Sequence, residues 1–141
     1  MGKGKKKQKA KIIPPSYEPS SVLASGAPEN DSPLFCFKHL QDKSLKGCGN
    51  SKLLTDFLFR LSKLGQLGWK EIKMSDRHSF GMEKIPIQQI IPSLPSFVTP
   101  DVSHLHVFRA TGDNHVFVGL QRQQVFHVLF IETEFGDIYE H

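Results

Sequence analysis

The sequence predicts an α+β domain, a two-layer sandwich of one main helix on a four-stranded, mainly antiparallel sheet. Three observations predict it. A leucine-rich run over residues 51–65 has helical periodicity, three β-rich runs follow one another over residues 103–133, and an alternating run at 34–40 precedes the helix. The apolar stripe of the helix is broad enough to need a sheet to lie on.

Residues 1–33 are predicted to be a basic, disordered arm, so that the folded domain spans residues 34–141. Residues 1–11 contain six lysines and no acid, and residues 12–33 are rich in Pro, Ser, Gly and Ala without a periodic apolar pattern. The whole chain has 18 basic and 14 acidic residues, so the part after residue 11 has 12 basic and 14 acidic ones. The arm is therefore either a phosphate-attracting segment or a solubilising extension.

The first ordered elements are expected to be a strand over residues 34–40 and a helix over residues 51–65. In the strand, two phenylalanines alternate with Cys and Lys, and residues 41–50 then supply a loop. Ser51 is the expected N-cap of the helix, and Gly65 is expected to stop it. This helix is the clearest element that the sequence predicts.

The middle of the chain is expected to consist of loops, with a short helical turn near residues 87–91. Prolines break long helices and are excluded from central strands, and this stretch has four of them: Pro86, Pro92, Pro95 and Pro100. The simplest explanation for the charged residues in this stretch is that they lie in a loop exposed to solvent.

Three β-rich runs at residues 103–110, 114–121 and 124–133 are joined by the turn signals "TGDN" and "RQQ", which predicts an antiparallel meander. The last run is apolar on both faces and is therefore expected to be a central strand. Strict alternation along this run predicts that one face carries Val125, His127, Leu129 and Ile131. The opposite face then carries Phe126, Val128 and Phe130. The tail after this run is expected to be tied down by Ile138 and Tyr139.

The order of elements and the C-terminal run "HVFRATGDNHVFVGLQRQQVFHVLFIETEFGDIYEH" resemble the C-terminal half of RelE/ParE-superfamily toxins. The shared features are an arginine-ending strand, a turn, a strand that carries Gly119, an apolar strand, an acidic turn, and a final Tyr and His. The leucine-rich helix, Trp69 and the stretch "RHSFGMEKI" also resemble the region that precedes this meander in the family. The resemblance covers residues 34–141.

This resemblance implies a toxin-like endoribonuclease that acts on free or ribosome-bound RNA without metal and is neutralised by a cognate antitoxin. Metal-free cleavage needs a base for the ribose 2′-OH, a cation for the phosphorane oxygens and an acid for the departing 5′-oxygen. By resemblance, Tyr139 and His141 are the proton-transfer pair and Arg109 faces the phosphate. Arg77 and His78, beside Glu83 and Lys84, are second choices.

Each of these residues also has a structural explanation. Tyr139 could cover the sheet, His141 could be an exposed terminal residue, and Arg109 could extend from the sheet edge or pair with Glu132. His127 lies between apolar neighbours, which favours a hydrogen-bonded core histidine over a catalyst. The alternative function is accordingly a non-enzymatic protein-interaction module of the same fold.

A zinc site is a further alternative. His104 and His106 are two residues apart on a predicted strand and so point the same way, and His115 on the next strand could approach them. No carboxylate or Cys falls at an obvious ligand spacing, so a polar edge strand is preferred and no metal or cofactor is expected.

The composition favours a cytoplasmic protein that does not act in the membrane. No apolar run approaches the roughly eighteen residues that a membrane-spanning helix needs. The two cysteines, Cys36 and Cys48, lack the CxxC spacing, so they are expected to be reduced packing residues.

Overall fold

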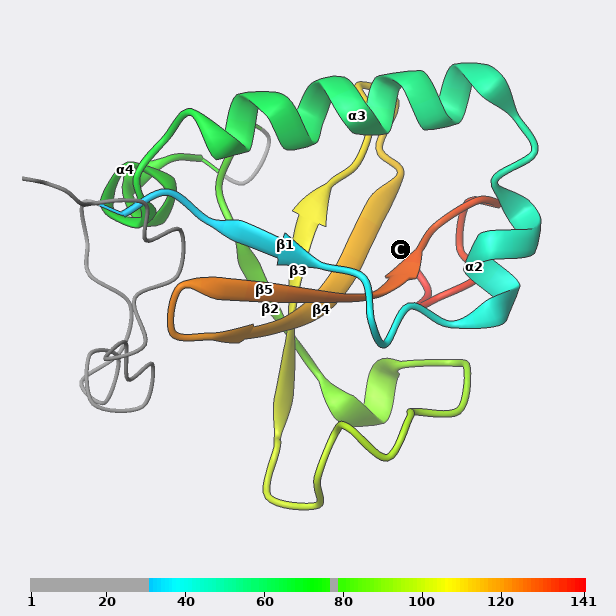
Figure 1. The fold of residues 1–141 in the computed structure, drawn as a ribbon. Helices are drawn as coiled ribbons and strands as arrows, with labels where there is room; N and C mark the ends of the chain where they lie inside the picture. Colours follow the sequence, from blue (N-terminus) through cyan, green and yellow to red (C-terminus); the bar gives the residue numbers. More distant parts are fainter. Residues whose placement is uncertain (1–30, 77–78) are drawn as a thin grey trace, which may run out of the picture.

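The computed structural model describes residues 31–76 and 79–141 (Figure 1). In this part of the chain the fold is α+β, as predicted, but the sheet has five strands rather than four, and three helices accompany it rather than one. The strands lie in the order β1-β5-β4-β3-β2, and their bounds are Leu34–Cys36 for β1, Glu83–Pro86 for β2, His104–Arg109 for β3, Val116–Arg122 for β4 and Val125–Ile131 for β5. Only the β1–β5 pair in this sheet is parallel.

The predicted meander is confirmed, because β3, β4 and β5 are consecutive antiparallel neighbours. Strand β5 lies between β1 and β4 and is therefore central, as its apolar faces indicated. The strand that the sequence did not predict is β2, in the proline-containing stretch. It lies at the sheet edge and ends at Pro86. Proline has no backbone N–H, and at an edge strand this does not interrupt the hydrogen bonds between inner strands.

Helix α3, Ser51–Gly65, has the predicted bounds, but its N-cap is Asn50 and not Ser51. The Asn50 Oδ1 accepts hydrogen bonds from the backbone N–H groups of Lys52 at 3.0 Å and Leu53 at 3.1 Å. The other described helices are α2, Asp42–Gly47, and α4, Trp69–Met74, and the predicted turn near 87–91 is the 3₁₀ helix η1, Ile87–Gln89. No helix of the described residues is long and apolar enough to cross a membrane.

The loop predicted at residues 41–50 was wrong because α2 occupies most of it. The first strand stops at Cys36, four residues earlier than predicted, and the chain turns where Leu40 N donates to Phe37 O at 3.1 Å. The Ser44 hydroxyl then bonds to the backbone of Ile131, accepting from its N–H at 2.9 Å. This contact between residues far apart in sequence ties α2 to the end of β5.

One face of the sheet is covered by α3, which runs along the top of Figure 1, and by α4, which lies at the left of that view. Phenylalanine rings from both layers meet there edge to face, for example Phe57 and Phe117 with centroids 5.1 Å apart. Trp69 of α4 is fully buried and its Nε1 donates to Gln124 O at 3.1 Å. The core residues of this helix-covered face are Phe57, Leu64, Trp69, Ile72, Phe108, Ala110, Phe117, Phe126, Val128 and Ile131.

The strict alternation predicted for β5 fails at a β-bulge. Val128 pairs with Gly119 and Phe130 with Val118, so Leu129 is an extra residue on β5. Ile131 therefore joins Val128 on the helix-covered face instead of lying opposite to it. The close approach also requires Gly119, because a Cβ there would lie 2.0 Å from the carbonyl oxygen of His127.

The opposite face of the sheet is covered without a long helix. It is covered by residues 87–102, which lie below the sheet in Figure 1, and by the C-terminal residues 138–139. Ile138 is only 2% exposed, and its carbonyl oxygen accepts from Ile91 N at 2.7 Å. The prediction that Ile138 and Tyr139 tie down the tail is confirmed.

Candidate functional site

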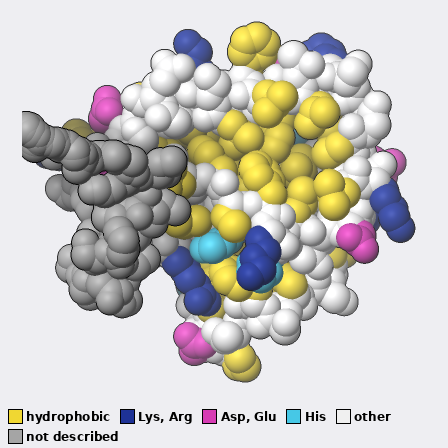
Figure 2. Space-filling model, in the orientation of Figure 1, with side chains coloured by type: hydrophobic (Ala, Val, Ile, Leu, Met, Phe, Trp, Pro, Cys, Tyr) yellow, Lys and Arg dark blue, Asp and Glu magenta, His cyan; other side chains and the backbone are white. Residues whose placement is uncertain are grey.

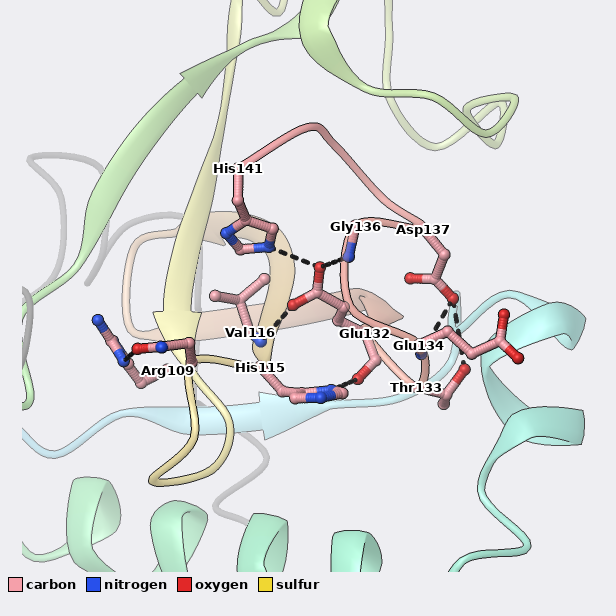
Figure 3. A network of polar contacts seen from close by, with 10 residues as sticks. Arg109, His115, Val116, Glu132, Thr133, Glu134, Gly136, Asp137 and His141 are labelled. Atoms are coloured by element: carbon pink, nitrogen blue, oxygen red, sulfur yellow. Dashed lines mark hydrogen bonds and ion pairs between the residues drawn. The ribbon is translucent and has the colours of Figure 1, made fainter.

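A fully buried carboxylate lies where β5 ends. Glu132 is 0% exposed, and Figure 3 shows its side chain among three donors. Its Oε1 accepts from Val116 N at 3.1 Å and its Oε2 accepts from Gly136 N at 2.7 Å. Its Oε2 also lies 2.6 Å from Nε2 of His141. A buried charged group needs such partners, and Glu132 has them from the strand β4, the following turn and the tail.

The turn after Glu132 brings the chain back to this carboxylate. Gly136 has φ of +88°, a conformation that residues with a Cβ rarely adopt, and this aims its N–H at Glu132. The buried Ile138 then anchors the chain on the sheet. The tail thereby brings the imidazole of His141 back to a residue nine positions earlier.

Two aromatic rings flank the imidazole of His141. Phe135 is stacked on it with centroids 4.0 Å apart and planes at 17°, and Tyr139 lies at 4.6 Å and 31°. As a carboxylate, Glu132 only accepts hydrogen bonds, so Nε2 of His141 carries the proton in their contact. The other nitrogen, Nδ1, is then left as a proton acceptor when the ring is neutral. The arrangement places an oriented imidazole next to a phenol.

Arg109 ends β3 on the side of the sheet away from α3. Its guanidinium donates to the Oδ1 of Asn114 in the β3–β4 hairpin. Asn114 has φ of +78°, so the hairpin turns sharply there, and its side chain positions the arginine. Arg109 also helps to lower the pKa of Arg60, although burial of Arg60 is the larger cause.

The three residues that the sequence favoured for catalysis line one hollow of about 400 Å³, here called the Arg109 hollow. Arg109, Tyr139 and His141 border it, and so does Glu83 of β2. The remaining lining residues are Gln89, Asn114, Val116, Phe135 and Glu140. A cation, a phenol, an imidazole and two carboxylates thus surround a single space. The second choices, Arg77 and His78, lie outside the described residues.

A larger hollow of about 710 Å³ adjoins the first, here called the Ile91 hollow. Its lining is Gln89, Ile91, Phe135, Gly136, Glu140 and His141. The two hollows share Gln89, Phe135, Glu140 and His141, so the imidazole lies at their border.

Sequence reasoning missed the role of Glu132, which it considered only as a partner of Arg109. The carboxylate instead accepts from His141 and from two backbone N–H groups. The available signal was an acid that directly follows the buried run of β5, because an acid buried at a strand end must find donors nearby. Which donors these are depends on the fold of the tail.

The three histidines of the zinc alternative do not converge. His104 and His115 lie at opposite ends of the β3–β4 pair. The Nδ1 of His115 contacts Glu132 O at 2.8 Å. His106 accepts from Gln121 N at 3.1 Å. Burial, with a smaller contribution from Lys84, lowers the pKa of His106 to about 4. Among the described residues, no group of three His, Cys, Asp or Glu side chains could hold a metal ion.

His127, for which the sequence predicted a hydrogen-bonded core histidine, is half-buried on β5. Its Nδ1 is buried, and residues 31–76 and 79–141 supply no hydrogen-bond partner for it. Its ring lies 4.7 Å from Phe97, which also stacks on His39. Burial, and then the nearby His39 and Arg122, lower the pKa of His127.

An exposed apolar patch lies away from these hollows. Figure 2 shows it as the yellow side chains over the region of β1 and α3. The exposed large apolar side chains of these two elements and of the turn after β1 include Leu34 at 55%, Phe37 at 42%, Leu54 at 41% and Leu58 at 58%. Contiguous apolar surface of this kind commonly marks contacts with other proteins.

Comparison of this chain with protein-family models, with curated proteins and with solved structures gave no match.

Proposed function

We propose that the chain is a toxin-like endoribonuclease that cleaves RNA by metal-independent acid/base catalysis in the Arg109 hollow. The observation that carries the proposal is that Arg109, Tyr139 and His141 line one space. These residue types supply the charges and protons that the reaction needs. The fold of RelE-like toxins and regulation by a cognate antitoxin belong to the same proposal.

In the proposed reaction, Nδ1 of His141 takes the proton of a ribose 2′-OH. The 2′-oxygen attacks the adjacent phosphorus, the bond from phosphorus to the 5′-oxygen breaks, and a 2′,3′-cyclic phosphate and a 5′-hydroxyl result. The hydroxyl of Tyr139 gives a proton to the departing 5′-oxygen. Arg109 binds the non-bridging oxygens, where negative charge increases in the transition state.

Glu132 acts through His141 in this scheme. Its carboxylate holds Nε2 at 2.6 Å, which fixes the ring and favours the tautomer that leaves Nδ1 free of a proton. Glu132 is fully buried and is therefore a positioning residue without access to RNA. The stack of Phe135 on the imidazole restricts the ring further.

The test is single-turnover cleavage of a labelled RNA, with EDTA present and with ribosomes present or absent. The His141→Ala variant should slow cleavage about a hundredfold or more, as is typical for loss of a general acid or base. Arg109→Lys should also slow it, because a point charge cannot bind phosphate bidentately. Tyr139→Phe removes the hydroxyl and keeps the ring.

The matched control is His104→Ala, which removes an exposed imidazole on β3 that lines neither hollow. It should cleave as fast as the unaltered chain, and thermal melts of all variants should show that they are folded. If the unaltered chain cleaves RNA in none of these conditions, the proposed function is wrong. If His141→Ala cleaves normally, the assignment of the base is wrong.

The exposed apolar patch supports a second candidate, a non-enzymatic protein-interaction module. Leu54 and Leu58 are one helical turn apart on α3, and Leu34 and Phe37 extend the patch to β1 and the turn after it. A protein partner that covers this patch would bury apolar surface without involving either hollow. This candidate becomes the better account if RNA is not cleaved.

A further inference from the structure

We propose that the Ile91 hollow binds an unpaired guanine base of a single-stranded RNA. This proposal rests on the proposed function and adds the substrate feature that the site recognises. The hollow adjoins the Arg109 hollow along four shared residues, Gln89, Phe135, Glu140 and His141. A nucleotide whose phosphate lies near Arg109 can therefore place a neighbouring base in the second space.

The Ile91 hollow offers a stacking surface. Phe135 is 56% exposed although its ring is stacked on His141, so a large part of the ring faces solvent. Ile91 is 63% exposed and lines the same hollow. Exposed aromatic rings bind unpaired bases by stacking, and the imidazole behind Phe135 holds the ring in place. A volume of about 710 Å³ is sufficient for a nucleoside.

The charge of the lining favours a base over a phosphate. Among the described residues that line this hollow, Glu140 is an acid and none is Lys or Arg. Carboxylates line both hollows, because Glu140 borders the two of them and Glu83 borders the Arg109 hollow. Only the Arg109 hollow also contains a guanidinium, which attracts phosphate. The two hollows thus differ in the part of a nucleotide that each can accept.

The polar side chains of the Ile91 hollow select among bases. The carboxylate of Glu140 offers two acceptor oxygens, and the Gln89 amide offers a donor and an acceptor. Both residues also line the Arg109 hollow, so they lie where the two hollows meet. Guanine is the base whose Watson–Crick edge has two adjacent donors, the N1–H and the N2 amino group, which match a carboxylate. Adenine, cytosine and uracil each place an acceptor beside their donor.

The experiment measures equilibrium binding of short 2′-O-methyl RNAs to the full chain by fluorescence anisotropy at fixed salt. These RNAs lack the 2′-OH nucleophile, so binding is separated from cleavage. A uridine tract with one central guanine should bind about tenfold more tightly than tracts with adenine, cytosine or uracil there. Glu140→Gln should reduce this preference to about twofold or less, and Phe135→Leu should weaken binding to every tract.

Glu134→Gln is the matched control, because it removes an exposed acid from the same tail without altering either hollow. It should keep the guanine preference. Equal binding of all four tracts, undetectable binding, or a preference that survives Glu140→Gln would overturn this inference even if RNA is cleaved. A guanine preference that depends on Glu140 without any cleavage would uphold the binding site and refute the nuclease.

Discussion

The two faces of the sheet are covered in different ways. On one face, α3 packs phenylalanine and leucine side chains against β3, β4 and β5, and α4 packs Trp69 and Ile72 there. On the other, residues 87–102 and the tail supply the cover, and only the short helix η1 lies within them. Both faces have fully buried residues, but Arg109, Glu132 and His141 gather where the irregular cover meets the sheet.

The difference follows from backbone hydrogen bonding. A helix satisfies its own N–H and C=O groups, so α3 can lie on the sheet with an apolar stripe alone. An irregular segment must find partners one by one, as Ile91 N does at Ile138 O. Irregular segments packed on a sheet in this way leave hollows lined by polar side chains, and binding and catalysis need such features.

The largest expected effect compares two phenylalanines of β5 on opposite faces. Phe126 packs against the rings of Phe108 and Phe117 at 5.0 and 5.6 Å, so Phe126→Ala should lower the free energy of unfolding by about 3–5 kcal/mol. Phe130→Ala should stay near the lower end of that range, because the irregular cover can close over the cavity. Urea unfolding measures both.

An equal or larger loss for Phe130→Ala would contradict this comparison. It would mean that residues 87–102 are as closely fixed as the helices. Hydrogen exchange of the same variants sharpens the result, since faster exchange confined to residues 87–102 is expected for Phe130→Ala.

The next effect concerns the polar pair on the irregularly covered face. Glu132→Gln keeps the size of the side chain but replaces one acceptor oxygen by an NH₂ group among N–H donors. We expect a loss of about 2–3 kcal/mol in the free energy of unfolding, because a buried donor is left unsatisfied. Chemical denaturation measures it, and the exposed Glu134→Gln should change stability by less than about 0.5 kcal/mol.

If Glu132→Gln unfolds with the stability of the unaltered chain, the carboxylate does not hold the tail. The prediction that Glu132 positions His141 would then fail as well.

The smallest effect is a pH dependence that comes from His106. Burial lowers its pKa to about 4 from an ordinary value of 6.5, so the unfolded chain binds its proton more readily than the folded one. Its stabilising contribution should be complete above pH 6.5 and decline as the pH falls toward 4. Because the ring is partly solvated, we expect a loss of about 1–2 kcal/mol.

Urea unfolding of the unaltered chain and of His106→Gln at pH 7 and pH 4.5 tests this contribution. The difference in stability between the two proteins should shrink at the lower pH. A difference that stays constant would show that His106 does not titrate in this interval.

Part of the site could be found from the sequence because it follows from local pattern. The pattern of the three-stranded meander predicts that Arg109 lies at the end of a strand. The apolar residues of the tail predict that Tyr139 packs against the sheet. The roles of Arg109, Tyr139 and His141 came from a resemblance and stay predictions. Their meeting at one hollow is what the structure adds.

Several features depend on contacts that no local pattern contains. Helix α2 is tied to Ile131 by Ser44, and strand β2 is defined by its pairing with β3. The β-bulge at Leu129 moves Ile131 to the other face of the sheet and so brings the next residue, Glu132, to the side of the tail. A one-residue insertion of this kind reverses the facing of all later side chains.

By itself, the sequence determined the α+β class, helix α3, the three-stranded meander and the central place of β5, because periodicity and turn residues act over neighbouring positions. Only the tertiary structure decided that Glu132 is buried and that His141 is its partner. The physical reason is desolvation: a carboxylate removed from water binds whichever donors the folded chain brings to it. Here those donors come from a strand, a turn and the tail.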